Sequence, residues 1–541
     1  MGGEFDYDYL IIGSGFGGSV SALRLTEKGY KVAVLEMGKR FTADTLPTTT
    51  WQAHRHLWAP RLGLHGIAQI TWLSDLLLFH GAGVGGGSLV YAATLLVPPA
   101  KAFRNQGWPG AADWQERLAP HYETAKRMLG VVEAKNIYST DEALREVVEE
   151  DYGRGGTFHR HTVGIYFGEP GKTVPDPFFN GEGPERTGCI ECGSCMVGCR
   201  HNSKNTLDKN YLYLAEKQGC EIVPETKVVD VRPLPGGGYE VDTVCSTRPW
   251  RRAVTTRRAR GVVFSAGVLG TVELLMQCKE RGSLPRLSER LGDFVRTNSE
   301  AILGVNSKDR RANVGRGIAI SSGVYPDDDT HIEMVRYGMG ADSMSWLMTL
   351  LTGGGDTLPR WVRLVGNILA HPLQFLHTLN PIGWSRRTIV VLVMQPLDSY
   401  MKLRLRRNWF GGSRIDTALV PGQDVPKYLP IGNRITQRLA ERLDGVPQSL
   451  SLEVIGNTSS TAHILGGAAM GDSPERAVCD EKGRVFGYDN LYVADGSLVP
   501  ANLGVNPSLT ITALSEYVMS QVPGKREGEM SHEALSVESL A

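Results

Sequence analysis

The chain has 541 residues, of which 41% are hydrophobic and 21% charged, and its 58 Lys and Arg residues balance 58 Asp and Glu residues. This length exceeds what one hydrophobic core supports, so we expect a globular protein of two or more domains. The zero net charge excludes a field that would attract nucleic acid, and no nucleic-acid partner is expected.

The N-terminus predicts no export signal. It enters an apolar run at once, without the basic and apolar segments of a secretory signal. No uninterrupted apolar stretch is long enough to span a bilayer. Eight cysteines, four of them close together, suit a reduced compartment better than a disulfide framework. These features predict a cytoplasmic protein.

The first segment has the order strand, glycine turn, helix and strand. It reads DYLIIGSGFGG over residues 8–18 and ends in YKVAVLE at Glu36. In this pattern Gly13 allows a tight turn, Gly15 lets a pyrophosphate approach, and Gly18 lets the helix pack on the strand. The helix N-terminus favours negative charge, and Glu36 is placed to accept from a ribose hydroxyl. The segment predicts dinucleotide binding, and a purely structural glycine turn is the alternative.

A second glycine loop, GAGVGGGSLVYAATL, covers residues 81–95. It lacks the strand and helix of the first, so by itself it predicts only a flexible turn.

Four cysteines lie within the eleven residues CIECGSCMVGC, from Cys189 to Cys199. Their C-x2-C-x2-C-x3-C spacing is that of bacterial ferredoxins, although Arg200 stands where ferredoxins have Pro and no second run exists. Cys189, Cys192, Cys195 and Cys199 are therefore candidate ligands of one iron–sulfur cluster of the 4Fe-4S or 3Fe-4S type. A structural zinc site and a set of unmetallated thiols are the alternatives.

An apolar segment rich in Leu and Trp covers residues 343–387. It predicts a lid over the substrate or an amphipathic element that contacts a membrane surface, and a pair of core-packing helices is the alternative. The polar stretch 524–541 is expected to be a disordered tail.

Near the C-terminus, a short strand ends at Asp495 and a helix begins near Pro507. Proline suits a first helical turn because its missing N–H costs nothing there. The positive end of this helix can therefore point at an electron-rich group.

Five motifs follow one another in the order GSGFGG, GVGGGSLV, FSAGVLGTVELL, HILGG and NPSLTITALSE. In this order the chain resembles the glucose–methanol–choline (GMC) flavoprotein oxidoreductases, and among them the cholesterol-oxidase-like branch, over nearly its whole length. The resemblance implies an α/β fold with a Rossmann-like FAD-binding domain and a substrate domain with a sheet backed by helices. The expected FAD-binding domain comprises residues 1–44, 80–100, 220–303 and 470–523, and the substrate domain 45–79, 101–219 and 304–469.

The same resemblance implies where FAD binds. Glu36 would meet the adenosine ribose, the backbone of Val228 the adenine, and Asp495 the ribityl chain or pyrophosphate. The expected cofactor-binding residues are Gly13, Gly15, Gly18, Glu36, Gly83, Gly85, Gly86, Gly87, Ser88, Val228, Ala266, Gly267, Asp495, Gly496, Asn506, Pro507 and Ser508. Tyr91 departs from the Asn or His of many relatives, which predicts non-covalent FAD.

Alcohol oxidation requires a base for the hydroxyl proton and an acceptor for the hydride, which is flavin N5. The resemblance makes His463 this base or the group that orients the hydroxyl, and Asn506 the second hydrogen-bonding group. Cholesterol oxidases also carry a glutamate that shifts the steroid double bond. The matching stretch, VRYGMGADSMSW, offers Asp342 and no convincing glutamate, so isomerisation is not expected here.

The resulting hypothesis is an FAD-dependent oxidation of a hydrophobic secondary alcohol, a 3-hydroxysteroid for example. The electrons would leave through the iron–sulfur cluster to a quinone-like or protein acceptor. One alternative is an oxygen-dependent sterol oxidase with a structural or zinc-binding cysteine loop. Others are a redox protein without alcohol turnover and an NAD-dependent dehydrogenase, for which no nicotinamide half-site is found.

Overall fold

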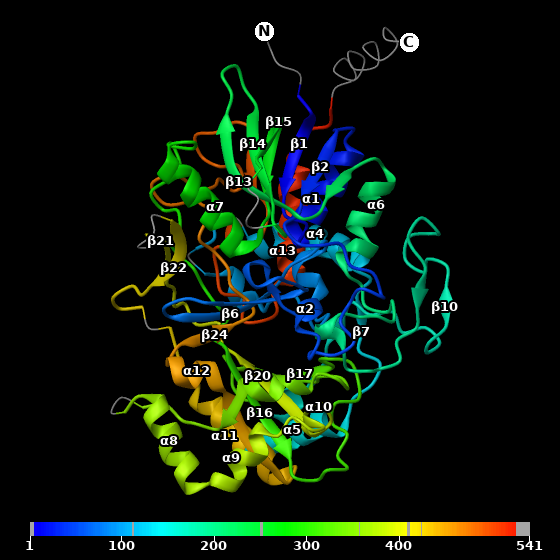
Figure 1. Ribbon diagram of the computed structural model, residues 1–541, viewed down its shortest axis with the longest axis vertical. Helices are drawn as coiled ribbons and strands as arrows, with labels where there is room; N and C mark the ends of the chain where they lie inside the picture. The colour runs from blue at the N-terminus through cyan, green and yellow to red at the C-terminus, as the bar shows by residue number, and fades with distance from the viewer. Residues whose placement is uncertain are drawn as a thin grey trace.

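The computed structural model describes residues 5–105, 107–110, 113–248, 253–355, 358–407, 412–423 and 425–525. Two large sheets occupy opposite ends of an elongated molecule (Figure 1). The tail expected at 524–541 lies outside the described residues, apart from 524 and 525.

The upper sheet in Figure 1 is built around the first glycine-turn strand, β1 (Tyr7–Ile12). β2 (Val32–Leu35) and β12 (Glu221–Val223) continue it in parallel on one side. On the other side lies β15 (Thr255–Phe264), also parallel, followed by antiparallel β14 (Tyr239–Cys245) and β13 (Thr226–Pro233). β25 (Leu491–Val493) pairs in parallel with the end of β15. The predicted α/β class with a Rossmann-like unit is confirmed.

Five helices of seven residues or more in the described part of the chain share one hydrophobic core with this sheet. They are α1 (Phe16–Glu27), α4 (Trp114–Met128), α6 (Tyr211–Lys217), α7 (Gly267–Arg281) and α13 (Ser508–Ser520). α13 lies between α1 and α4, and α6 packs on α1. The expected substrate-domain range 101–219 thus contributes two helices to the core of the nucleotide-binding sheet. The domain division itself stays a prediction.

The lower sheet is antiparallel throughout, in the order β19-β23-β16-β20-β18-β17-β8. Its strands are β8 (His159–Arg160), β16 (Ala301–Ser307), β17 (Ser322–Val324), β18 (His331–Val335), β19 (Met348–Leu350), β20 (Thr388–Met394) and β23 (Gly445–Leu450). α5 (Ser139–Tyr152) and α11 (Pro430–Arg442) pack on it through a common apolar cluster. A sheet backed by helices is what the sequence predicts for this part.

A small sheet lies between the two large ones (Figure 1). It consists of β5 (Ala68–Trp72), β6 (Leu76–Gly81) and β24 (Ser459–Thr461). β6 leads into the second glycine loop, whose short helix η2 (Gly86–Leu89) follows, and β24 leads to His463.

The apolar segment 343–387 forms η6 (Asp342–Leu347), β19, α8 (Arg360–Ala370), α9 (Pro372–Leu379) and α10 (Trp384–Arg387). Leu364, Ile368 and Phe375 turn inward into a small apolar cluster. Leu369, Leu373 and Leu376 are 77%, 79% and 62% exposed. The segment is therefore core-packing on one face and exposed and apolar on the other.

The remaining elements are short. They are α2 (Ala53–His56), β3 (Trp58–Ala59), η1 (Pro60–Leu62), β4 (Leu64–His65), α3 (Ala100–Phe103), β7 (Val132–Glu133), η3 (Gly155–Thr157), β9 (Thr162–Val163), β10 (Thr173–Val174), β11 (Arg186–Thr187), η4 (Cys195–Val197), η5 (Leu207–Lys209), β21 (Lys402–Arg407), β22 (Ser413–Ala418), α12 (Ser451–Gly456) and η7 (Gly496–Leu498).

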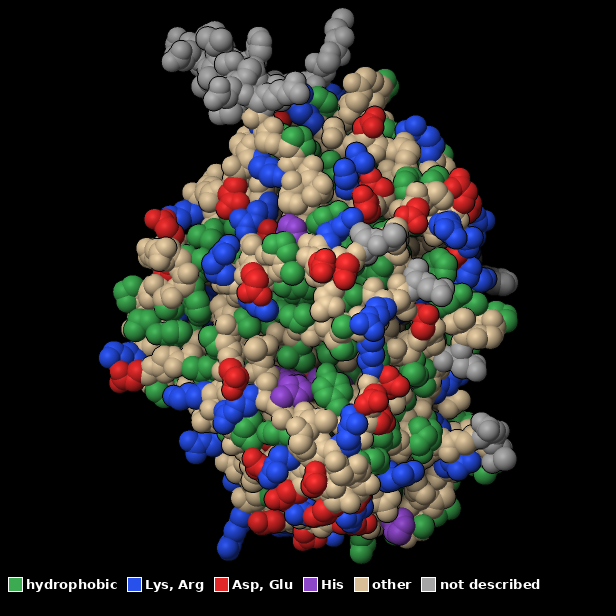
Figure 2. All heavy atoms as spheres, turned by 180° about the vertical axis from the view of Figure 1, so that it is seen from behind, with side chains coloured by type: hydrophobic (Ala, Val, Ile, Leu, Met, Phe, Trp, Pro, Cys, Tyr) green, Lys and Arg blue, Asp and Glu red, His purple; other side chains and the backbone are tan. Residues whose placement is uncertain are grey.

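Charged side chains of both signs are interspersed over the face in Figure 2, as the balanced composition leads one to expect. In the described part of the chain, none of the helices has the length and apolar character needed to cross a membrane.

Candidate active site

The first glycine turn has the geometry of a nucleotide cradle. A Cβ on Gly13 would lie 2.4 Å from the carbonyl oxygen of Ser265, and one on Gly18 would lie 2.0 Å from that of Gly13. A Cβ on Gly15 would meet nothing within 4 Å. Gly13 and Gly18 thus serve close backbone packing, whereas Gly15 faces open space at the start of α1. This space and the free N–H groups of the helix suit a pyrophosphate, so these residues fit FAD.

Glu36 lies at the end of β2 and is almost completely buried. It accepts hydrogen bonds from Ser14 Oγ at 2.7 Å, Ser14 N at 3.0 Å and Gly38 N at 2.7 Å. Burial raises the pKa of the carboxyl, and these hydrogen bonds oppose that rise. Thr226 N, at the start of β13, donates to the Glu36 carbonyl oxygen, which places the Val228 strand beside Glu36.

The second glycine loop lies against the first. A Cβ on Gly86 would lie 2.7 Å from Cα of Gly15, and Gly85 N donates to Ser14 Oγ at 3.0 Å. Gly83, Gly85 and Gly86 have positive φ angles, which the sharp turn before η2 requires. The fully buried Ser88 bonds to Gly85 O and Leu207 N and so holds the loop in shape. Gly87 lies between Gly86 and Ser88 in η2.

The third part of the nucleotide site is the end of β25 with the start of α7. Asp495 is buried and accepts from Thr271 Oγ1 at 2.6 Å and Ser497 N at 2.8 Å, and burial raises the pKa of its carboxyl. Ala266 is the N-cap of α7 and Gly267 its first residue, with φ of 72°. Gly496 starts η7, directly after Asp495.

Asn506, Pro507 and Ser508 lie at the start of α13, with Pro507 as its N-cap. A Cβ on Gly17 of α1 would lie 1.5 Å from the carbonyl oxygen of Ala494, so α1 and the β25 end are in close contact. The structure thus brings the predicted glycine, Asp495 and α7 residues to one place. The motif analysis missed Gly17, Gly38 and Ser14, although Gly17 and Ser14 stand inside the GSGFGG motif.

His463 and Asn506 face each other. His463 Nε2 lies 3.4 Å from Asn506 Nδ2, and both side chains are largely buried. Asn506 Oδ1 is buried and makes no hydrogen bond among the described residues. A hydroxyl that enters here could bond to both side chains, as an alcohol oxidation site requires.

Glu300, just before β16, is the partner of His463 that the sequence did not reveal. Its carboxylate contacts His463 Nδ1 and accepts from Ala462 N at 3.0 Å. Burial disfavours the charged imidazolium, but the Glu300 charge and hydrogen bond outweigh burial, and the pKa of His463 is raised. Glu300 thus holds Nδ1, and Nε2 is the ring nitrogen that faces Asn506; a base paired in this way is oriented toward its substrate. No motif marks this lone acid in TNSEAILGV.

Glu333 corrects the expectation that no glutamate reaches the site. It lies on β18, is completely buried, and its Oε2 is 3.5 Å from Asn506 Nδ2. Burial raises its pKa to about 8, against the lowering influence of His463 and Asn506. Asp342 lies elsewhere and accepts hydrogen bonds from Ser385 N and Oγ at 2.9 and 2.7 Å. Glu333 stands two residues before the stretch VRYGMGADSMSW and belongs to no motif of its own.

Tyr91 lies beside the second glycine loop and donates to the carbonyl oxygen of Asn205 at 2.6 Å. Its ring packs on Phe16, near the start of α1. This arrangement gives Tyr91 a structural role, and non-covalent FAD stays a prediction.

All four clustered cysteines line one cavity, together with Lys204 and the backbone near Gly317. None of them forms a disulfide. Glu191 N donates to Cys189 Sγ at 3.4 Å. Lys209 and Lys204 and backbone N–H groups lower the pKa of the Cys199 thiol, although burial opposes this, whereas burial raises the pKa of Cys189 to about 12.

The four sulfur atoms are more dispersed than the ligands of one ion. No three of them appear among the described groups of ligand atoms that all lie within 4.8 Å of one another. A cluster of several irons spreads its ligands further apart than one zinc ion does. The arrangement therefore does not favour the zinc alternative.

Comparisons with known proteins find similarities over most of the chain. A family profile described as GMC oxidoreductase matches residues 430–515, which include His463 and Asn506. An NAD(P)-binding Rossmann-like profile matches residues 11–73. A cholesterol oxidase of Acinetobacter baumannii is 47% identical over 96% of this chain and 95% of its own. A cholesterol oxidase of Mycobacterium tuberculosis is also 47% identical, over 96% of this chain and 92% of its own.

Solved structures agree in fold. A pyridoxine 4-oxidase from Mesorbium loti has a TM-score of 0.60 over 95% of this chain and 98% of its own, at 15% identity. A formate oxidase of Aspergillus oryzae gives the same TM-score and identity over 95% and 97%. At this identity the likeness concerns the fold alone.

Proposed function

The chain belongs to the GMC oxidoreductase family and is an FAD-dependent enzyme that acts on CH–OH groups, and we propose that it oxidises the secondary hydroxyl of a sterol. The cholesterol oxidases at 47% identity support the sterol as substrate. The observation that carries the chemistry is the buried contact of His463 with Glu300 on one ring nitrogen and Asn506 on the other.

The protein's own residues account for the proton. His463 Nε2 accepts the hydroxyl proton, and Glu300 stabilises the imidazolium that forms. Asn506 holds the substrate oxygen in place. Gly13–Gly18, Glu36, Gly83–Ser88 and Asp495 would hold FAD, which supplies the hydride acceptor when bound.

Glu333 supports a second step at the same site. A buried carboxyl whose pKa is about 8 exchanges protons readily near neutral pH. We propose that, after oxidation of a sterol whose C5–C6 double bond is separated from the new C3 ketone by C4, Glu333 takes a proton from C4 and returns it to C6, which leaves a C4–C5 double bond conjugated with the ketone.

The direct test of substrate class is anaerobic reduction of the bound flavin. Cholesterol should bleach the flavin, whereas short primary alcohols should do so much more slowly, and the product should be the 3-ketone. His463→Ala should bind FAD but slow this reduction by about 10²-fold. Rapid bleaching of the variant by cholesterol would remove His463 from the mechanism.

The electron acceptor has two candidates. The relatives are named oxidases, which supports oxygen. The second candidate is an iron–sulfur cluster held by Cys189, Cys192, Cys195 and Cys199, for which their spacing in the sequence is the argument. Buried cationic Lys204, whose Nζ donates to the Cys195 carbonyl at 2.7 Å, would stabilise the negative charge of such a cluster.

Iron and sulfide analysis of anaerobically purified protein separates these candidates. A cluster predicts about four or three irons per chain and faster turnover with quinone-like acceptors than with oxygen. Cys192→Ser with Cys195→Ser should then lose the iron and keep flavin reduction by substrate. Iron-free protein with rapid oxygen consumption would leave oxygen as the acceptor.

We also propose that the exposed leucines of α8 and α9 touch a lipid surface, where a sterol resides. Trp361 and Val365, 51% and 49% exposed, extend this apolar face along α8. The cytoplasmic location stays a prediction.

A further inference from the structure

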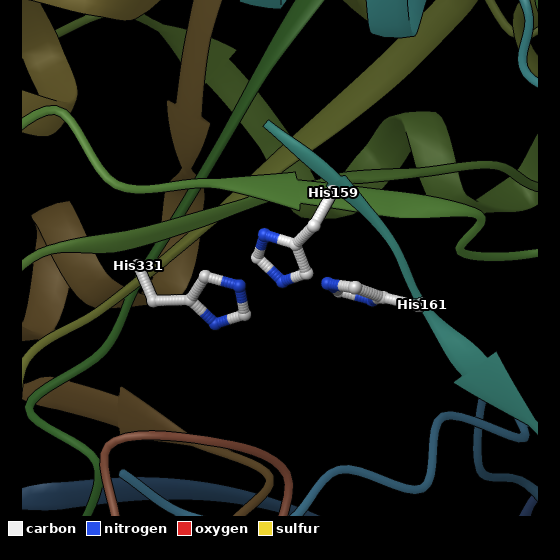
Figure 3. Close-up of side chains that lie close together, drawn as sticks. All are labelled: His159, His161 and His331. Carbon is white, nitrogen blue, oxygen red and sulfur yellow. The ribbon is translucent and has the colours of Figure 1, made fainter. Parts of the chain in front are cut away.

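Three histidines meet beside the catalytic residues. His159 begins β8, His161 follows this strand, and His331 begins β18. Each offers a ring nitrogen, and these three atoms lie within 4.8 Å of one another. They are the one group of three or more His, Cys, Asp or Glu side chains with this spacing among the residues that the structure describes. Figure 3 shows the three rings gathered around one region.

Gly323 keeps a space open between two of these rings. It lies on β17, where it pairs with His159 of β8 on one side and with Glu333 of β18 on the other. A Cβ on Gly323 would lie 2.3 Å from Nε2 of His331 and 2.4 Å from Nε2 of His161. With no Cβ at this position, no side chain separates the Nε2 atoms of His331 and His161.

The polar atoms of the cluster lack partners. Both ring nitrogens of His161, both of His331 and Oε1 of Glu333 are buried without a hydrogen bond in the described structure. Buried polar atoms left without partners are costly, so native proteins usually pair them. Tyr325 stacks on the ring of His331 at 4.6 Å and so fills the remaining side with carbon rather than with a hydrogen-bond partner.

The Nδ1 atoms of the three rings face a backbone carbonyl or a carboxylate, as the second nitrogen of a metal-binding histidine does. His159 Nδ1 lies 3.0 Å from the carbonyl oxygen of Thr157, so it donates there and leaves Nε2 with a lone pair. Nδ1 of His161 and of His331 lie 3.6 and 3.9 Å from Glu333 Oε1. Metal-binding histidines commonly direct their second nitrogen at a backbone carbonyl or a carboxylate in this way.

We propose that His159, His161 and His331 bind one divalent transition metal ion of the zinc class, and that Glu333 links this site to Asn506. Imidazole nitrogens suit zinc, copper, nickel and iron, and three of them leave a position open. The rings draw together on binding, because a tetrahedral ion needs its nitrogens roughly 3.3 Å apart.

The role of the metal would be to position Glu333. With the metal bound, Nδ1 of His161 and of His331 both carry protons and can donate to Oε1 of Glu333. Its Oε2 then stays directed at Asn506. This consequence rests on the proposed function, whereas metal binding itself does not.

The test measures the metal content of untagged, full-length protein purified from cells grown with added zinc. We expect about one ion per chain with nitrogen and oxygen ligands by X-ray absorption, which excludes the cysteines as its source. His161→Gln and Gly323→Ala should each lower this content at least tenfold. Gly323→Ala keeps all three imidazoles, but its methyl group forces the rings of His331 and His161 away from their positions. His56→Gln, which removes a buried histidine outside the cluster, should keep the full content.

Titration of metal-stripped wild-type protein needs no variant. Zn2+ or Co2+ should raise its melting temperature, and Co2+ should give visible bands of a four- or five-coordinate nitrogen and oxygen site. Wild-type protein that shows neither nitrogen-bound metal nor a thermal shift with Zn2+, Co2+, Ni2+ or Fe2+ would overturn the proposal. So would His161→Gln protein of normal circular dichroism that keeps the ion. Metal binding without catalytic activity would fail only the proposed function.

Discussion

His463 owes its chemistry to one neighbour. Its Nδ1 contacts the buried carboxylate of Glu300, which raises the pKa of the imidazole although burial acts in the opposite direction. A base works in its neutral form, so flavin reduction should increase with pH through a pKa above 6.5, the usual value for histidine.

Glu300→Gln tests this dependence. The variant lacks the carboxylate that raises the pKa of His463. The acid limb of the pH profile for flavin reduction should therefore move to lower pH. The maximal rate should fall about tenfold or more, because the ring is less well held. Stopped-flow reduction across pH gives both values. Glu289→Gln, on the surface, serves as control, and an unshifted acid limb in Glu300→Gln would contradict the assignment.

Glu333→Gln separates oxidation from isomerisation. An amide cannot carry the proton, so the variant should release the unconjugated ketone while alcohol oxidation stays within about tenfold. Ultraviolet absorbance of the conjugated ketone follows the second step, and flavin reduction follows the first. Asp342→Asn, which changes the acid near the position of the family's glutamate, should leave both unchanged. A conjugated product formed at the normal rate by Glu333→Gln would exclude this role.

Only some of the site residues can be identified from sequence motifs. His463 and Asn506 stand in short motifs that resemble those of the GMC family, and the chain folds them into contact. No short sequence motif marks Glu300 or Glu333. They come near His463 and Asn506 only in the folded chain, where β16, β18, β24 and the start of α13 lie together. The three histidines are likewise spaced along two strands, and only the pairing of β8, β17 and β18 unites them.

At the scale of elements, α8 and α9 combine two roles that the sequence offered as alternatives. Leu364 and Phe375 pack inward, while Leu369, Leu373 and Leu376 face outward. Apolar periodicity predicts such helices well, but which face is covered depends on neighbours far along the chain. The same holds for α4 and α6, which join the nucleotide-binding core from a range expected in the other domain.

Replacing Leu369, Leu373 and Leu376 together with Ser tests the lipid contact. A buried leucine contributes about 1.5–3 kcal/mol, so the triple variant should bind phosphatidylcholine vesicles at least tenfold more weakly. Cosedimentation measures binding, and turnover of detergent-dispersed sterol should be unaffected. Val254→Ser changes an exposed apolar residue at the other sheet and should change nothing. Equal sedimentation of wild type and triple variant would contradict the contact.

For the whole molecule, the nucleotide site joins segments from both ends of the chain. Gly13–Gly18, Glu36, the second glycine loop, α7 and Asp495 lie around one space, although only the first of these carries a complete sequence fingerprint. A ligand that binds only the folded chain stabilises it by about 4.1 kcal/mol at a concentration 1,000 times its Kd. Bound FAD should therefore add to the stability of the fold as a whole.

Acid precipitation of the holoenzyme tests whether FAD is attached to the protein by a covalent bond. Tyr91 donates a hydrogen bond to Asn205 O and is not a histidine, so the flavin should stay in the supernatant and be detected there as FAD.

The contribution of FAD to stability is measured on apoprotein from which the flavin has been removed at high salt without precipitation. This apoprotein should melt at a lower temperature than the holoenzyme, and added FAD should restore the original melting temperature. Gly15→Val, which places a side chain in the open space above the turn, should remain at the apoprotein value with FAD present. Flavin that stays with the precipitate would show a covalent bond, and equal melting temperatures would show that these segments hold one another without the cofactor.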